Sequence, residues 1–162
     1  VCVCVCVSEE GLAKLCAYEA FVRVRVHQKL GMFSTGFLPA PPTWPQCAPT
    51  TVPTVEPPPA LHTDLQGQVE DGNAYIAGGV LGHAGLFSTV GDLAKLARVW
   101  LFNEHGFLDR PTTSLFGKQH NHSQSSRALG WNTNDITAQP DGGWDQSCGS
   151  LSPLTFTHVG FT

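Results

Sequence analysis

The sequence predicts an α+β fold, in which helical segments come first and short strands follow. Apolar residues recur at helical spacing over Ser8 to Gly31 and over Thr89 to Asn103, and two later segments, Ala128 to Asn132 and Leu154 to Val159, have the composition of strands. A chain of 162 residues with 41% apolar content is long enough to bury a core. We therefore expect one domain, with helices beside strands of an antiparallel sheet.

The first helix is predicted by its two ends and its apolar residues. Ser8 is an acceptable N-cap, the two glutamates after it suit the positive end of the helix dipole, and Gly31 is a suitable stop. Arg23 and Arg25 alternate with valines, a local pattern that is also typical of a strand. The expected apolar stripe consists of Leu12, Leu15, Phe21, Val22, Val26 and Leu30.

A proline-rich connector follows. Nine of the twelve prolines lie between Pro39 and Pro59, and proline lacks the N–H that helices and central strands use, so we expect an extended segment here. The predicted layout is one partial domain, with a helical start at 1–38, the connector at 39–68, a glycine-rich loop and capped helix at 69–103, and a loop with strands at 104–162.

The clearest helix begins at Thr89. Thr89 is the expected N-cap, and Asp92 three residues later completes a T-x-x-D capping box. A shorter helix is predicted over Thr112 to Lys118. The side chains of the Thr89 helix that we expect to pack inward are Leu93, Leu96, Ala97, Trp100 and Leu101.

The loop from Gly78 to Gly85 is the most informative segment. It is rich in glycine and carries one histidine, His83. Glycine has no Cβ, so such a loop can bring its backbone close to a ligand or another strand. We therefore expect a pocket wall. Asp71, which precedes it, is expected to hydrogen-bond backbone in the turn before Asn73.

Composition and charge exclude several classes of function. A net charge of −4 argues against a nucleic-acid binder or an anionic-membrane binder, which would need a basic surface. No apolar run approaches the roughly 20 residues that cross a bilayer. Cys2, Cys4 and Cys6 fall on one strand face and could bind a soft metal, but no second cluster supplies the ligands of a closed zinc site. We predict no metal site.

The usual nucleophile motifs are absent from the sequence. It contains no G-x-S-x-G, no Ser-x-x-Lys and no phosphate loop of the Walker type. The remaining candidates are His83, among glycines, and His158, near the end of an apolar strand. Taken singly, such histidines more often have structural roles.

The order of five short segments shifts this balance from a structural towards a functional role for the two histidines. They are VRVHQKLGMFSTGF (Val24 to Phe37), VEDGNA (Val69 to Ala74), GHAGLFST with the following DLA (Gly82 to Ala94), LGW (Leu129 to Trp131) and THVGFT (Thr157 to Thr162). In this order they resemble the serine β-lactamase-like family, which includes class C β-lactamases, DD-peptidases and related esterases. Lys29 stands where the family's PLGM has proline.

The resemblance implies acyl transfer at an amide or ester carbonyl of a small-molecule or peptide substrate, without a cofactor. In the family a Ser-x-x-Lys serine forms the acyl-enzyme, with help from a Tyr-x-Asn motif, beside a Lys/His-Thr-Gly strand. By resemblance, His158 takes the Lys/His position and supports the tyrosine or a substrate carboxylate, and Phe161 supplies an oxyanion N–H. The implied substrate-binding residues are His83, Ala84, Val159 and Gly160.

The departures from the family pattern limit what this chain is expected to do. Val159 replaces the Thr or Ser of the strand motif, and the 23 residues before Val24 contain neither Ser-x-x-Lys nor Tyr-x-Asn. We therefore expect a hydrolase fragment that is inactive alone, with an unpaired last strand, ending at Thr162, that aggregates or pairs with another chain. The alternatives are a non-catalytic module that binds peptides or glycans, and a metal-binding protein that uses the cysteine run with His120 and His122.

Overall fold

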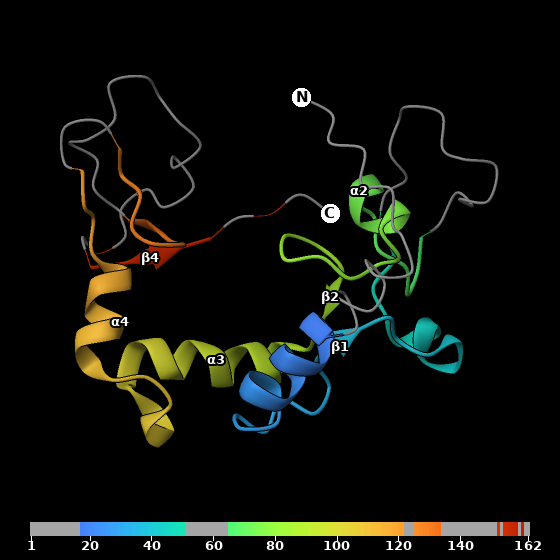
Figure 1. Cartoon of the computed structure of the whole chain (residues 1–162), viewed down its shortest axis with the longest axis horizontal. Coiled ribbons are helices and arrows are strands. Elements are labelled where there is room, and N and C mark those ends of the chain that lie inside the picture. The colour runs from blue at the N-terminus through green and yellow to red at the C-terminus, as the bar shows by residue number, and fades with distance from the viewer. Residues whose placement is uncertain are drawn as a thin grey trace. The chain divides into compact units, whose positions relative to one another are not determined.

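A computed structural model of the chain describes residues 17–50, 65–121, 125–133, 152, 154–158 and 160 (Figure 1). The chain divides into two compact units, Val1–Arg98 with Thr162 and Val99–Phe161. The helices and short antiparallel strands confirm the predicted α+β class. Within the described residues, no helix combines the length and apolar character that crossing a bilayer requires.

The described part of the first unit starts within a helix, over 17–22, that continues as the π-helix η1 (Arg23–His27). Gln28 N–H donates to the Arg23 carbonyl at 2.9 Å, five residues back. After a turn, Gly31 adopts φ 65°, which confirms it as the stop. The predicted stripe is wrong at Phe21, which is 61% exposed, whereas His27 is buried.

The wide turn of the π-helix accounts for the burial of His27 at its end, because one extra residue per turn rotates side chains relative to a regular helix. Val22 and Val26 are half-buried and Leu30 is buried, as the stripe predicts. Leu12 and Leu15 lie outside the described residues.

The proline-rich segment is only partly extended. Pro41–Gln46 forms the 3-10 helix η2, with proline at its first positions. The expectation of a fully extended connector is therefore wrong here, because the fixed φ of proline also suits the start of a helical turn. Trp44 Nε1 donates to the Pro39 carbonyl at 2.8 Å and closes this turn. Residues 51–64 of the connector lie outside the described residues.

Two strands and a short helix complete the frame of the first unit. Strand β1 (Gly36–Phe37) pairs antiparallel with β2 (Leu86–Phe87), with Gly36 opposite Phe87 and Phe37 opposite Leu86. Helix α2 (Gly72–Ile76) precedes the glycine-rich loop. The buried apolar side chains of this unit are Leu30, Met32, Leu65, Ala74, Ala77 and Val80.

Helix α3 (Val90–Phe102) begins as predicted but turns a different face inward. Thr89 Oγ1 accepts from the Asp92 N–H at 3.2 Å, which confirms Thr89 as the N-cap. Asp92 is buried, whereas Leu93 and Leu101 are 49% and 58% exposed and Ala97 is exposed.

The predicted inward face of α3 is therefore wrong at Leu93, Ala97 and Leu101. Leu96 and Trp100 are half-buried, and Val99 is fully buried. The helix is oriented by polar bonds between Asp92 and the segment before β1, and these bonds override the apolar periodicity.

The second unit contains the 3-10 helix η3 (Glu104–Gly106), helix α4 (Arg110–Gly117) and the strands β3 (Asn132–Thr133) and β4 (Phe156–Thr157). The short helix predicted at Thr112 to Lys118 is thus present and starts two residues earlier. Asp109 caps it by accepting from the Thr112 N–H at 2.7 Å.

The two late strands are shorter than predicted. β3 and β4 pair antiparallel, with Asn132 opposite Thr157. Ala128 to Trp131 forms a turn rather than a strand, because Ala128 N–H donates to the Trp131 carbonyl at 2.8 Å and Gly130 has φ 83°. The turn leaves only the last residue of the predicted segment in β3.

Aromatic rings hold the second unit together. The Trp131 ring meets Trp100 edge-on at a centroid distance of 5.5 Å and Phe156 at 5.0 Å, and Trp100 lies 5.9 Å from Phe116. The two contacts of Trp131 are edge-to-face, which suits the quadrupoles of the rings, and the Trp100–Phe116 pair is tilted. They join α3, α4, the LGW turn and β4, so Trp100 has the packing role that its helical spacing predicts.

Candidate functional site

An aspartate–histidine pair lies where α2 begins. The Asp71 carboxylate accepts from the Ala74 N–H at 2.7 Å and so caps α2, which confirms the predicted backbone contact. The same oxygen, Oδ1, lies 3.2 Å from Nε2 of His83, whose side chain is 58% exposed. The capped carboxylate therefore fixes one edge of the imidazole while the rest of the ring faces solvent.

The glycine-histidine loop (Gly78–Gly85) is closed on itself. Gly78, Gly79 and Gly85 have φ of 90°, 85° and 100°, a region that side chains other than glycine rarely adopt. A Cβ on Gly85 would collide with the Gly79 carbonyl oxygen. Leu81 N–H donates to the Ala84 carbonyl at 3.3 Å, and Gly79 N–H donates to the Ala74 carbonyl at 2.7 Å.

The close approach that the glycines predicted is therefore made within the loop. The backbone near Gly85 meets the backbone near Gly79, which explains the missing side chain of Gly85, whereas a Cβ on Gly79 would meet the Leu38 side chain. The folded loop presents His83 as an exposed side chain and Ala84 as a half-buried one. It is a stiff support for the histidine, since the loop is anchored to α2 on one side and to β2 on the other.

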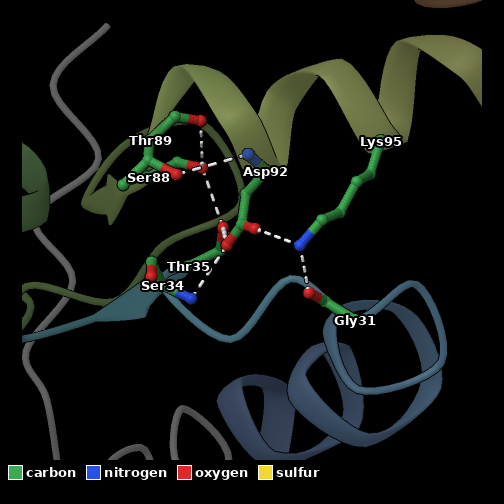
Figure 2. Close-up of polar contacts among 7 residues, drawn as sticks. All are labelled: Gly31, Ser34, Thr35, Ser88, Thr89, Asp92 and Lys95. Carbon is green, nitrogen blue, oxygen red and sulfur yellow. Dashed lines mark hydrogen bonds and ion pairs between the residues drawn. The ribbon is translucent and has the colours of Figure 1, made fainter.

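A buried polar network lies between α3 and the segment before β1 (Figure 2). The Asp92 carboxylate accepts from Ser34 N–H at 2.8 Å, from Thr35 Oγ1 at 2.9 Å and from Lys95 Nζ at 2.8 Å. Thr35 Oγ1 also shares a hydrogen bond of 2.7 Å with Ser88 Oγ. Lys95 Nζ donates in addition to the Gly31 carbonyl.

Sequence reasoning missed this network, because it placed Asp92 in a capping box. The signal was available in the two segments STGF and STVGD, which place hydroxyl groups beside a carboxylate. Lys95 Nζ donates to two acceptors, and it is the cationic member of the network.

Hydrogen bonds lower the pKa of both aspartates, Asp71 and Asp92. The backbone N–H of Ala74 is the largest cause of the lowered pKa of Asp71, and the bond to His83 lowers that pKa further. For Asp92, the Lys95 ammonium is the main cause of a lowered pKa, followed by the Thr35 hydroxyl and the Ser34 N–H, against the opposing effect of desolvation. Both groups are therefore carboxylates at neutral pH.

The remaining predicted site residues belong to the other end of the chain. His158 follows β4 and is exposed, and Gly160 is also exposed, with nothing near the position that a Cβ would occupy. Val159 and Phe161 lie outside the described residues. His83 belongs to the first unit and His158 to the second, and each is described within its own unit.

The metal-binding alternative gains no support from the described residues, where no group of three His, Cys, Asp or Glu side chains could hold an ion. His120 Nε2 lies 2.9 Å from the Leu115 carbonyl in the second unit. His122 and the cysteines at 2, 4 and 6 fall outside the described residues.

Comparison with known proteins agrees with the motif order. The family model described as Beta-lactamase matches residues 10–162. A protein of Salmonella enteritidis PT4 named "Putative D-alanyl-D-alanine carboxypeptidase" is 35% identical over 159 residues, which cover 89% of this chain and 35% of that protein. A protein of the same name from Escherichia coli K12 is 36% identical over 105 residues, 60% of this chain and 23% of its own length.

The chain thus spans about a third of the length of the first of these relatives. No solved structure matches it. The family model covers nearly the whole chain and includes all five motif segments. The chain therefore belongs to the beta-lactamase family.

Proposed function

We propose that this chain forms one wall of the acyl-transfer cleft of a serine β-lactamase-like hydrolase. The observation that carries the proposal is the glycine-histidine loop, which holds an exposed His83 against a capped Asp71 carboxylate. A rigid loop with one oriented polar side chain is what a substrate-binding wall requires. The motif order and the family match support the assignment.

In this proposal the substrate lies against the segment after β4. His158 takes the position of the family's Lys or His and supports a tyrosine or a substrate carboxylate through its imidazole. Gly160, without a side chain, lets the substrate approach the backbone, and the N–H of Phe161 completes the oxyanion hole. Val159 lacks the hydroxyl of the family motif, which weakens substrate binding at that point.

The substrate class we propose is a peptide or small molecule with a reactive amide or ester carbonyl. Both relatives are named "Putative D-alanyl-D-alanine carboxypeptidase".

We further propose that this chain alone forms no acyl-enzyme, because the sequence contains no Ser-x-x-Lys and no Tyr-x-Asn. Incubation with a fluorescent penicillin and with a fluorophosphonate probe tests this, with an active DD-peptidase as positive control. We expect no covalent labelling of the chain. Stoichiometric labelling of any serine, located by peptide mass spectrometry, would overturn the proposal.

A second candidate is a non-catalytic module that binds peptides or glycans with the same wall. The exposed His83 and His158, in a chain without a nucleophile motif, favour it. Titration with cell-wall peptides and glycan fragments, followed by ring-proton NMR of the histidines, distinguishes the two. Saturable shifts that disappear in His83→Ala support binding, and a flat titration dismisses it.

A further inference from the structure

We propose that Asp92 is a positioning residue for the glycine-histidine loop, acting through Thr35, Ser88 and the β1–β2 pair. The role deepens the proposed function and rests on it, since the loop matters only as a wall of the cleft. The contacts that carry it all lie within the first unit. They form a continuous path from the start of α3 to both ends of the loop.

The path begins at a fixed anchor. Asp92 is 4% exposed, and its carboxylate accepts from a backbone N–H, a hydroxyl and an ammonium group. Bonds to an ionised acceptor are among the strongest in proteins and have restricted geometry. Because Lys95 also reaches the Gly31 carbonyl, the anchor ties α3 to the turn that ends the first helix (Figure 2).

The next step joins the two strands. Thr35 directly precedes β1 and Ser88 directly follows β2, and their hydroxyl oxygens are 2.7 Å apart. Thr35 Oγ1 can donate to Asp92 and accept from Ser88 at the same time, so one side chain links the anchor to both strands. The register places Gly36 opposite Phe87, immediately beside this link.

The last step runs from β1 to the loop. A Cβ on Gly85 would lie 3.5 Å from Cδ1 of Phe37, and one on Gly79 would lie 2.5 Å from Cδ2 of Leu38. Two neighbouring residues at the end of β1 therefore contact both ends of the loop. The Tyr18 ring packs against Phe37 with ring centroids 6.0 Å apart.

The strands need this support because each has only two residues. A two-stranded pair of that length is not stable by itself. The hydroxyl–carboxylate link adds bonds that are independent of the strand ladder. The position of the loop, and hence of His83, should therefore depend on the Asp92 network, although Asp92 contacts neither the loop nor His83.

Amide hydrogen exchange of Thr35→Val and Thr35→Ser tests the inference. Valine keeps the shape of threonine but removes both side-chain bonds, whereas serine keeps the hydroxyl. We expect the Gly79 and Leu81 amides to exchange roughly tenfold faster in Thr35→Val, since loss of an anchoring bond increases local opening. Thr35→Ser should restore protection to within about twofold of the original chain.

Two further variants make the result specific. Thr113→Val makes the same substitution at an exposed hydroxyl bond, from Thr113 Oγ1 to the Arg110 carbonyl in α4 of the second unit, and should leave the loop amides unchanged. Ser88→Ala removes the link between Ser88 and Thr35, together with a long bond of 3.5 Å from Ser88 Oγ to the Thr89 carbonyl, and keeps the bond from Thr35 to Asp92. It should speed exchange at Gly79 and Leu81 by a smaller factor. It serves in place of Thr35→Val if that variant unfolds.

The ring nitrogens of His83 give an independent readout. In the original chain their ¹⁵N shifts report the contact between Nε2 and Asp71, and we expect that signature to weaken in Thr35→Val and return in Thr35→Ser. Unchanged loop exchange and unchanged His83 shifts in Thr35→Val or Ser88→Ala would overturn the positioning role. The probe-labelling result bears only on the proposed function, so the two can fail separately.

Discussion

Replacing Asp92 by alanine should strongly destabilise the first unit. The bonds from Ser34 N–H and Thr35 Oγ1 are part-buried or buried, and a hydrogen bond to a charged group contributes about 1.5 kcal/mol at the lower end of its range. The ammonium of Lys95 is 43% exposed, so its share is reduced by solvent screening. We expect a loss of about 3 kcal/mol, which is roughly a hundredfold in the ratio of folded to unfolded chains.

Urea denaturation at pH 7, followed by far-UV circular dichroism, measures this loss. Asp109→Ala is the matched control, because Asp109 caps α4 in the second unit at an exposed position, with bonds from Thr112 alone, and should have a smaller effect. A loss below about 1 kcal/mol for Asp92→Ala, or one no larger than that of the control, would refute the assignment of a buried anchor.

The same anchor should respond to acid. The folded pKa of Asp92 lies below its ordinary value, so its contribution is complete above the unfolded pKa and is lost as the pH falls through the folded pKa. Asp92→Asn should be less stable at pH 7 and should lose less stability than the original chain between pH 5 and 3. Equal acid slopes for the two proteins would show that Asp92 is not ionised in a stabilising contact.

Three more predictions concern the loop, the aromatic cluster and the buried histidine. Gly85→Ala should destabilise the first unit by about 1–3 kcal/mol in urea, because its φ is 100° and a Cβ would meet the Gly79 carbonyl; a neutral effect would contradict the observed loop. Trp131→Ala should reduce stability by about 3 kcal/mol and shift the ring-proton signals of its neighbours, and unchanged signals would argue against the cluster. Burial lowers the folded pKa of His27, so its contribution is full above pH 6.5 and falls as pH drops below that value; His27→Gln should show less destabilisation between pH 7.5 and 5.5.

Features set by neighbouring residues were predictable from the sequence. Thr89 caps α3 through a bond to the N–H three residues on, and Asp71 caps α2 in the same way. Gly31 ends the first helical segment with φ 65°. Such contacts depend on residue type and short spacing, and both can be read directly from the sequence.

The face that α3 turns inward was not predictable in this way. Apolar periodicity favoured Leu93 and Leu101, but the helix buries Asp92 and Val99. The bond that decides the orientation joins Asp92 to a residue 57 positions earlier, and helical spacing carries no information about that partner. The π-turn that buries His27 was also not predictable, because an extra residue in a turn leaves no simple periodic signal in the sequence.

The sequence by itself determined the family, the helix caps and the identity of the loop that carries His83, because each depends on short motifs and their order. Only the tertiary structure decided what those residues touch. It showed that Gly85 makes room for the loop's own backbone and Gly79 for the Leu38 side chain, and that Asp92 anchors the segment before β1. The physical reason is that chain folding brings together donors and acceptors far apart in sequence, and a buried carboxylate is stable only where enough of them converge.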